Sequence, residues 1–215
     1  GARRRGDLAI RRQGPALLLG LHGKRSADIV DLHACPVLHP DLFALIAPLR
    51  TLLRGLGGLR RHGSAILNLL DSGPDLLLRT DAALTTADRT KLAAFAQAHG
   101  LPRITAAIGD GPHESAALLR PPTTAMSGIT VTPPPGAFLQ ASAEGEAAII
   151  AAVLAGLPKL AGKARIAELY AGCGTLTFAL AKQARTAAFE GDIEAHAALR
   201  QAANNSGLAG RVEAL

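Results

Sequence analysis

The segment from Arg165 to Glu190 constrains the fold of this chain more than any other part of the sequence. It begins with the short run Ile166–Tyr170, apolar apart from one acid, and continues through the small-residue turn Ala171–Thr175 into apolar residues at helical spacing. A second short apolar run, Ala187–Phe189, ends on an acid, Glu190. Strand, glycine turn, helix, strand and acid in this order predict the opening half of a doubly wound α/β sheet.

The glycine turn indicates a nucleoside site. Gly172 and Gly174 let the backbone approach a ligand closely, and the helix that follows presents free N–H groups. An acid at the end of the second strand, Glu190, can accept both hydroxyls of a ribose. The spacing does not suit a dinucleotide, because Thr177 stands where a third glycine would be needed. The alternative is an ordinary βαβ unit with a tight turn.

Length and composition allow one large domain or two small ones. The chain has 215 residues, is 48% hydrophobic and has no Trp, so its core must consist of Leu, Ala, Ile and Val. Its two cysteines, Cys35 and Cys173, do not suggest a disulfide framework. With no long apolar run and no signal-peptide pattern, we expect a cytoplasmic, monomeric protein without a membrane partner. We also expect it to be a piece of a longer chain.

Positive charge is concentrated in the first part of the chain. Residues 1–62 contain eleven Lys and Arg against four Asp and Glu, whereas the remainder contains twelve against thirteen. Such a one-sided excess is typical of nucleic-acid-binding proteins, although a solvated basic face would give the same count. The basic strand Arg3–Arg12 and the pair Lys24–Arg25 are the segments that we expect to contact RNA phosphates without reading the sequence.

Residues 1–122 alternate strand and helix patterns and predict an α+β domain. The expected strands cover residues 1–12, 16–21, 28–32, 65–70, 76–80, 103–108 and 115–119. One helix is expected to begin at Asp41, and a second, capped by Thr86 or Asp88, is expected to run to His99. In residues 123–215 we expect a bent β segment (129–132 and 137–140), a helix capped by Ser142, the unit described above, and a helix Ile193–Asn205.

Four separated motifs together resemble one family. The pattern Glu168-x-x-x-Gly172-x-Gly174 resembles motif I of class I S-adenosylmethionine (SAM) methyltransferases. Gly136–Ser142 resembles the F-x-Q-x-N segment of the RNA (uracil-5-)-methyltransferases, and Phe189–Gly191 with Ala202–Leu208 resembles their V-E-x…A-x-x-N-A-x-x-N-G pattern. Ser26–Leu38 is similar to the segment that carries the last cysteine of their [4Fe–4S] cluster. Order and separations agree across nearly the whole chain.

The resemblance implies a set of SAM-binding residues. Gln140 matches the glutamine at the methionine end of SAM, and Glu190 matches the acid that binds the ribose. Gly172 and Gly174 would permit close approach of the cofactor. Tyr170 and Thr175 stand where the family has Phe and Asn, so their side-chain contacts are departures from its pattern.

The resemblance also implies what this chain lacks. Cys35 matches the fourth ligand of the [4Fe–4S] cluster, whose other three cysteines would precede Gly1, so the cluster belongs to the parent protein and not to this fragment. Cys173, between two glycines, is interpreted as structural. The family's nucleophilic cysteine and its base would follow Leu215, so no catalytic residue is assigned here and the fragment itself is expected to be inactive.

The sequence therefore predicts an α/β protein: a central α+β domain (1–122) that contacts RNA, and the first half of a Rossmann-like SAM-methyltransferase domain (123–215). The implied activity is SAM-dependent methylation of carbon 5 of a uracil in RNA, with 23S rRNA as the expected substrate. The alternatives are a tRNA uracil-5 methyltransferase, and an RNA-binding module whose Rossmann-like part is structural. The basic excess disfavours a methyltransferase for small molecules or proteins.

Overall fold

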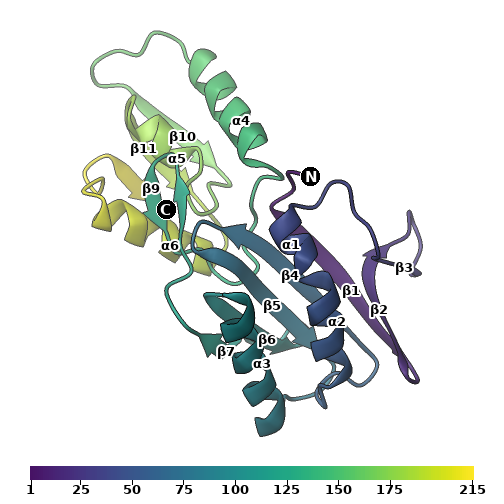
Figure 1. Ribbon diagram of the computed structural model, residues 1–215. Coiled ribbons are helices and arrows are strands. Elements are labelled where there is room, and N and C mark those ends of the chain that lie inside the picture. Colours follow the sequence, from purple (N-terminus) through teal and green to yellow (C-terminus); the bar gives the residue numbers. More distant parts are fainter. The chain divides into compact units, whose positions relative to one another are not determined.

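The computed structural model describes all residues from Gly1 to Leu215 and divides into two compact units, Gly1–Pro122 and Thr123–Leu215 (Figure 1). None of the helices combines the length and apolarity needed to cross a membrane.

The first unit is built on a seven-stranded sheet with the order β3-β2-β1-β4-β5-β6-β7, in which β5 and β6 form the parallel pair. Its strands are β1 (Arg5–Gln13), β2 (Ala16–His22), β3 (Ile29–Asp31), β4 (His62–Leu70), β5 (Gly73–Thr80), β6 (Arg103–Ile108) and β7 (Glu114–Leu118). Its helices are α1 (Pro40–Ala44), α2 (Ile46–Arg54) and α3 (Thr86–His99).

The core of this unit lies between the sheet and its helices, which share one face of it in Figure 1. In β1 every second residue turns to that side, so Leu8 and Ile10 are each only 1% exposed. Leu49 and Leu53 of α2 are fully buried against the same cluster. The predicted strands and the hairpin turn at Gly14–Pro15 are confirmed.

One predicted helix is interrupted in the structure, so the prediction of a single helix there is wrong. The apolar stripe that begins at Asp41 forms two helices, α1 and α2, which meet at Leu45. Pro48 explains the break, because it has no N–H to donate to the carbonyl of Ala44 and its ring would clash with that carbonyl. The chain instead starts a new helix at Ile46, which places Pro48 in the first turn, where the missing donor costs little.

A buried carboxylate holds the loop after α2 to the start of α3. Asp88 is 1% exposed and accepts backbone N–H groups from Gly57 (2.8 Å), Gly58 (3.0 Å) and Thr85 (3.0 Å). Thr85 completes a capping box by accepting the N–H of Asp88, so the cap is Thr85 and not Thr86 or Asp88 as predicted. Burial alone would raise the pKa of Asp88, but the hydrogen bonds from Thr85, Gly57 and Gly58 outweigh it, so the pKa lies below its ordinary value of 3.8.

Replacing Asp88 with asparagine is expected to destabilise the first unit by roughly 3 kcal/mol, because the buried, charged acceptor of three backbone N–H groups is lost. Since the folded-state pKa is depressed, this contribution is present above the unfolded-state pKa and disappears as the pH falls through the folded-state pKa. Urea titrations at neutral and acidic pH measure both effects. Glu114→Gln, which removes an exposed ion pair with Arg89, should cost below about 1 kcal/mol; equal losses in the two variants would contradict the assignment.

The second unit contains a three-stranded parallel sheet with the order β10-β11-β12 and a separate hairpin, β8-β9. Its strands are β8 (Thr124–Met126), β9 (Ile129–Val131), β10 (Arg165–Leu169), β11 (Arg185–Phe189) and β12 (Val212–Ala214). Its helices are α4 (Ala143–Ala155), α5 (Thr177–Ala181) and α6 (Ile193–Asn205). This is the strand, turn, helix and strand order predicted from the sequence.

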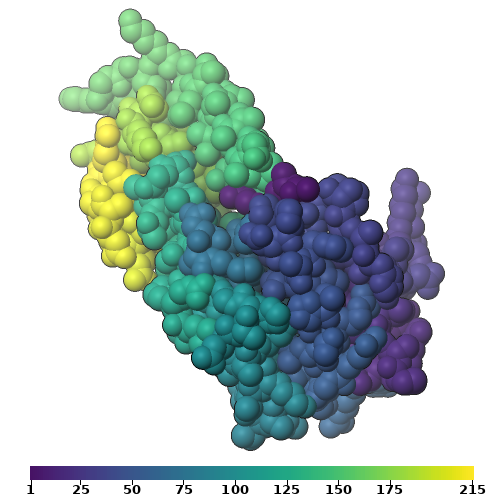
Figure 2. Space-filling view, viewed as in Figure 1, coloured from purple at the N-terminus to yellow at the C-terminus, as the bar shows by residue number.

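Helix α5 connects β10 to β11, and α6 connects β11 to β12, so both connections move across the sheet in the same direction. Because such connections are right-handed, both helices lie on one face of the sheet. Thr186, Ala188 and Val212 are buried under these helices. The opposite face is open: Leu169 is 67% exposed and Phe189 is 40% exposed. Helix α4 likewise has no buried residue, and its green atoms lie at the surface in Figure 2.

The bent β segment is only half confirmed. Residues 129–132 supply β9, which pairs with β8, a strand that the sequence analysis missed. Residues 137–140 form no strand, because Gly136 (φ +70°) turns the chain after three prolines and no neighbouring strand is available to pair with them. The cap at Ser142 is confirmed, since its side chain accepts the N–H of Gly145.

Candidate cofactor site

The glycine bend, Tyr170–Leu176, connects β10 to α5. Three of its first five residues have left-handed backbone conformations: Tyr170 (φ 57°), Gly172 (φ 58°) and Gly174 (φ 106°). A Cβ on Gly174 would collide with the ring of Phe178, which is fully buried, so only glycine fits there. A Cβ on Gly172 would meet no atom within 4 Å, so the backbone at this position faces open space.

Tyr170 has an unusual conformation for its size. A left-handed backbone costs a non-glycine residue roughly 1–2 kcal/mol, and Tyr170 is 91% exposed, so little packing offsets that cost. Residues with unfavourable backbone conformations of this kind cluster at binding and catalytic sites. The bend therefore presents an aromatic ring at the carboxyl end of a parallel strand, where doubly wound sheets bind their ligands.

Glu190 lies against the bend. It follows β11, whose last residue Phe189 pairs with Leu169 of β10, so the carboxyl ends of the two strands are adjacent. Its Oε2 accepts the N–H of Gly172 at 2.6 Å, and its Oε1 accepts the N–H of Asp192 at 2.8 Å. Each carboxylate oxygen retains a second lone pair, so the side chain is oriented by the protein and can still accept hydrogen bonds from a ligand.

The β8-β9 hairpin braces the bend, a feature that the sequence analysis missed. Ser127, at the hairpin turn, donates its hydroxyl to the carbonyl of Thr175 at 2.8 Å. Lys182, just after α5, donates to the carbonyl of Ser127 at 2.8 Å. The Thr175 hydroxyl is directed at the sulfur of Met126, 3.6 Å away, so this side chain serves the hairpin contact. Only the Ser127–Gly128 turn signal could have suggested this arrangement.

A second side-chain bond crosses the bend. The Thr177 hydroxyl, at the start of α5 and fully buried, donates to Oε2 of Glu168 on β10 at 2.6 Å. Burial raises the pKa of Glu168, against the opposing influence of this hydrogen bond. The pair ties the strand before the bend to the helix after it. Thr177 is the residue that occupies the third-glycine position of a dinucleotide site.

Cys173 is shielded in the bend. It is 6% exposed, and burial together with the carboxylates of Asp192 and Glu190 raises the pKa of its thiol to about 12. The group therefore stays protonated at neutral pH and is unsuited to nucleophilic attack.

Gln140 lies outside the hydrogen-bonded part of the site. It is half-buried directly after the buried Leu139 and makes no hydrogen bond to the bend. Its role at the methionine end of SAM stays a prediction.

The first unit does not assemble a metal centre. The thiol of Cys35 is half-buried and accepts the N–H of Leu38 at 3.4 Å. The chain contains no group of three or more His, Cys, Asp or Glu side chains placed to hold a metal ion. A [4Fe–4S] cluster requires four cysteine thiolates, so the residues of this chain alone do not fit one.

Two arginines of the basic strand also make internal contacts, and the predicted role of the strand in RNA binding stays a prediction. The Arg12 guanidinium donates to the carbonyls of Leu53 (2.9 Å) and Arg54 (3.1 Å) at the end of α2. Arg11 donates to the carbonyl of Ala27 at 2.7 Å. These bonds supply donors to carbonyls at the end of α2 and in the loop before β3, and they use part of the donor capacity of the two guanidinium groups. Lys24 and Arg25 remain exposed in the turn after β2.

The donor set at the bend fits SAM. A nucleoside with a charged sulfonium needs an acceptor for its ribose, backbone that it can approach closely, and an aromatic or apolar neighbour for its base. Glu190, Gly172 and Tyr170 provide these in that order. A parallel sheet with such a bend after its first strand and an acid after its second is characteristic of class I SAM-dependent methyltransferases.

Comparison with known proteins agrees with this class. An uncharacterized RNA methyltransferase of Rhizobium meliloti is 32% identical over 209 residues, covering 96% of this chain and 48% of that protein. The 23S rRNA (uracil(1939)-C(5))-methyltransferase RlmD of Edwardsiella ictaluri is 36% identical over 193 residues, covering 89% and 43%. No family model matches the chain. The chain is thus related to RNA (uracil-C5)-methyltransferases over most of its own length, and it spans under half the length of these two relatives.

A solved structure shows the same fold. The Pyrococcus abyssi tRNA (uracil-54, C5)-methyltransferase, in complex with S-adenosyl-L-homocysteine, superposes with a TM-score of 0.73. The match covers 99% of this chain and 54% of that one, at 17% sequence identity. The predicted fold class, mixed α/β with a SAM-methyltransferase part, is confirmed.

Proposed function

We propose that this chain forms the SAM-binding part of an enzyme that methylates carbon 5 of a uracil in 23S rRNA. The observation that carries the proposal is the placement of Glu190, whose carboxylate is bonded to the glycine bend from the end of the neighbouring parallel strand. The relatives in Edwardsiella ictaluri and Aeromonas salmonicida, named as 23S rRNA uracil-C5 methyltransferases, support the substrate.

Each residue at the bend has a distinct role in this proposal. Glu190 accepts the ribose hydroxyls, and the backbone of Gly172 and Gly174 borders the nucleoside. Tyr170 offers its exposed ring to the adenine. Thr175 contributes through its backbone, because its hydroxyl faces Met126. Gln140 is proposed to bind the methionine end.

The chain is not expected to methylate RNA by itself. Carbon 5 of uracil is a poor nucleophile, and its methylation requires prior addition of a thiolate at carbon 6. Cys173 is protonated and shielded, and Cys35 belongs to the first unit. In a longer protein that supplies further cysteines, Cys35 is proposed as the fourth ligand of a [4Fe–4S] cluster. Loss of the cluster's visible absorbance in a Cys35→Ser form of that protein would test this assignment.

Titration calorimetry with S-adenosyl-L-homocysteine tests the cofactor assignment on this chain. We expect saturable binding of one ligand per chain, and no binding of NAD⁺, because Thr177 replaces the third glycine that a pyrophosphate site needs. No heat with S-adenosyl-L-homocysteine, or equal binding of NAD⁺, would leave the RNA-binding module as the better description. Tritium transfer from labelled SAM by the longer protein, to 23S rRNA fragments against tRNA, distinguishes the two RNA substrates.

A further inference from the structure

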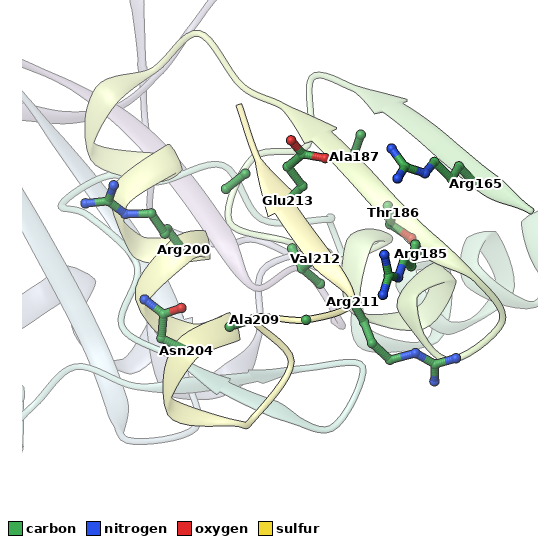
Figure 3. Close-up of a pocket in the computed structure, with 12 residues that line it drawn as sticks. Arg165, Arg185, Thr186, Ala187, Arg200, Asn204, Ala209, Arg211, Val212 and Glu213 are labelled. Atoms are coloured by element: carbon green, nitrogen blue, oxygen red, sulfur yellow. The ribbon is translucent and has the colours of Figure 1, made fainter. Parts of the chain in front are cut away.

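Three arginines lie together at the amino ends of the parallel strands, opposite the glycine bend. Arg165 of β10 and Arg185 of β11 are directly paired in the sheet register. Arg211 immediately precedes β12, whose first residue, Val212, pairs with the residue after Arg185. Figure 3 shows the three side chains on neighbouring strand starts, with Arg200 on α6 beyond them. The fold therefore gathers basic side chains that are far apart in sequence.

These side chains line two adjoining hollows. One has a volume of about 530 Å³ and is bordered by the three arginines and by Arg200. The other, of about 680 Å³, is bordered by the same three arginines and by Lys163. Because Arg165, Arg185 and Arg211 border both, we treat the two hollows as one feature, the arginine groove.

The cations of the arginine groove have no protein partners. None of its five basic side chains makes a hydrogen bond or an ion pair, and Glu213 is the single acid along its walls. Residues 123–215 contain seven Lys and Arg and seven Asp and Glu, so this unit is neutral overall while five of its seven cations border the groove. Like charges at this density create a local positive potential that an anion would relieve.

We propose that the arginine groove binds phosphate groups along the backbone of the RNA substrate, an inference that rests on the proposed function. Guanidinium groups present paired donors that match phosphate oxygens, and several in a row suit a chain of phosphates better than one small anion. Such contacts position RNA and raise affinity without reading its sequence.

The groove is separate from the cofactor site. Strand β10 is five residues long, which places its first and last residues about 13 Å apart, and the bend follows the last residue. RNA phosphates bound at the groove would thus contact the second unit at the end of the sheet opposite the proposed cofactor site. The acids that border the bend, Glu190 and Asp192, make the two ends of the sheet opposite in charge.

The test measures binding of a fluorescein-labelled single-stranded RNA by fluorescence anisotropy over a range of salt concentrations. The variant Arg165→Gln/Arg185→Gln/Arg211→Gln should bind at least about ten-fold more weakly at low salt. Its slope of log Kd against log salt should fall by about 2, since three contacts to a single strand are removed. The matched variant with three Arg→Lys changes keeps the charges and should keep most of the affinity and the slope.

A second control separates the groove from net charge. Arg54→Gln/Arg60→Gln/Arg61→Gln removes three exposed arginines of the first unit and should alter the salt slope little. Equal losses of RNA affinity in both glutamine variants, or an unchanged salt slope in the groove variant, would overturn the proposal. It would also be overturned if calorimetry showed that the groove binds inorganic phosphate while the groove variant kept the RNA affinity of the wild type. Binding of S-adenosyl-L-homocysteine should be equal in wild type and groove variant. If neither protein binds S-adenosyl-L-homocysteine but the variant still loses RNA binding, the proposed function is refuted while the RNA-binding role of the groove stands.

Discussion

Glu190→Ala is expected to weaken the binding of S-adenosyl-L-homocysteine by about 100-fold. Hydrogen bonds from ligand hydroxyls to a charged acceptor contribute roughly 1.5–3 kcal/mol, and each 1.4 kcal/mol is a factor of ten. The substitution also removes the acceptor that orients the N–H of Gly172, so the bend loses its fixed geometry. Titration calorimetry measures the effect directly.

The conservative variant refines this expectation. Glu190→Gln retains one oxygen acceptor, so its binding should be weakened only about ten-fold. Glu144→Ala, which removes an exposed carboxylate near the start of α4, serves as the control and should bind like the wild type. If Glu190→Ala binds within about three-fold of the wild type while circular dichroism shows an intact fold, the ribose assignment is wrong.

Gly174→Ala is expected to destabilise the second unit by about 3 kcal/mol or more. The new methyl group would overlap the buried ring of Phe178, and the backbone at φ 106° disfavours any side chain. Overpacking costs roughly 1–3 kcal/mol, and the unfavourable conformation adds to it. Gly172→Ala has the same chemistry but open space around its Cβ, so about 1 kcal/mol is expected there. Urea titrations followed by circular dichroism compare the two.

The cause of the larger effect can be checked by a double substitution. Phe178→Leu removes part of the ring that the methyl group would meet, so Gly174→Ala should cost less in that background than in the wild type. Additive effects would show that backbone strain, and not the overlap with Phe178, dominates. Equal costs for Gly172→Ala and Gly174→Ala would contradict the packing described for the bend.

The βαβ unit and the serine cap of α4 could be predicted from the sequence because their signals are local. Glycines at turns, a serine before a helix and a change of apolar period each act within a few residues. The same locality explains the errors. Pro48 splits an otherwise continuous apolar stripe, and β8 and β12 have only three residues each and no run of apolar residues that would mark them as strands.

The long-range contacts at the site differ in how far the sequence predicts them. That β10 and β11 are parallel neighbours follows from the order of elements, so an acid after β11 is placed beside the bend by topology alone. The brace formed by Ser127 and Lys182, 55 residues apart, depends on a hairpin whose position no local pattern specifies. The capping of α2 by Arg12 was hidden for the same reason, and the charge count had assigned that arginine to RNA.

The strained aromatic at the bend gives this protein a built-in optical probe. Tyr170 is its single tyrosine, and there is no tryptophan, so its ultraviolet emission arises from one ring beside the proposed adenosine position. A nucleoside stacking on that ring would quench the emission. Occupancy and exchange rates could then be followed in unlabelled protein, with excitation at wavelengths that the five phenylalanines do not absorb.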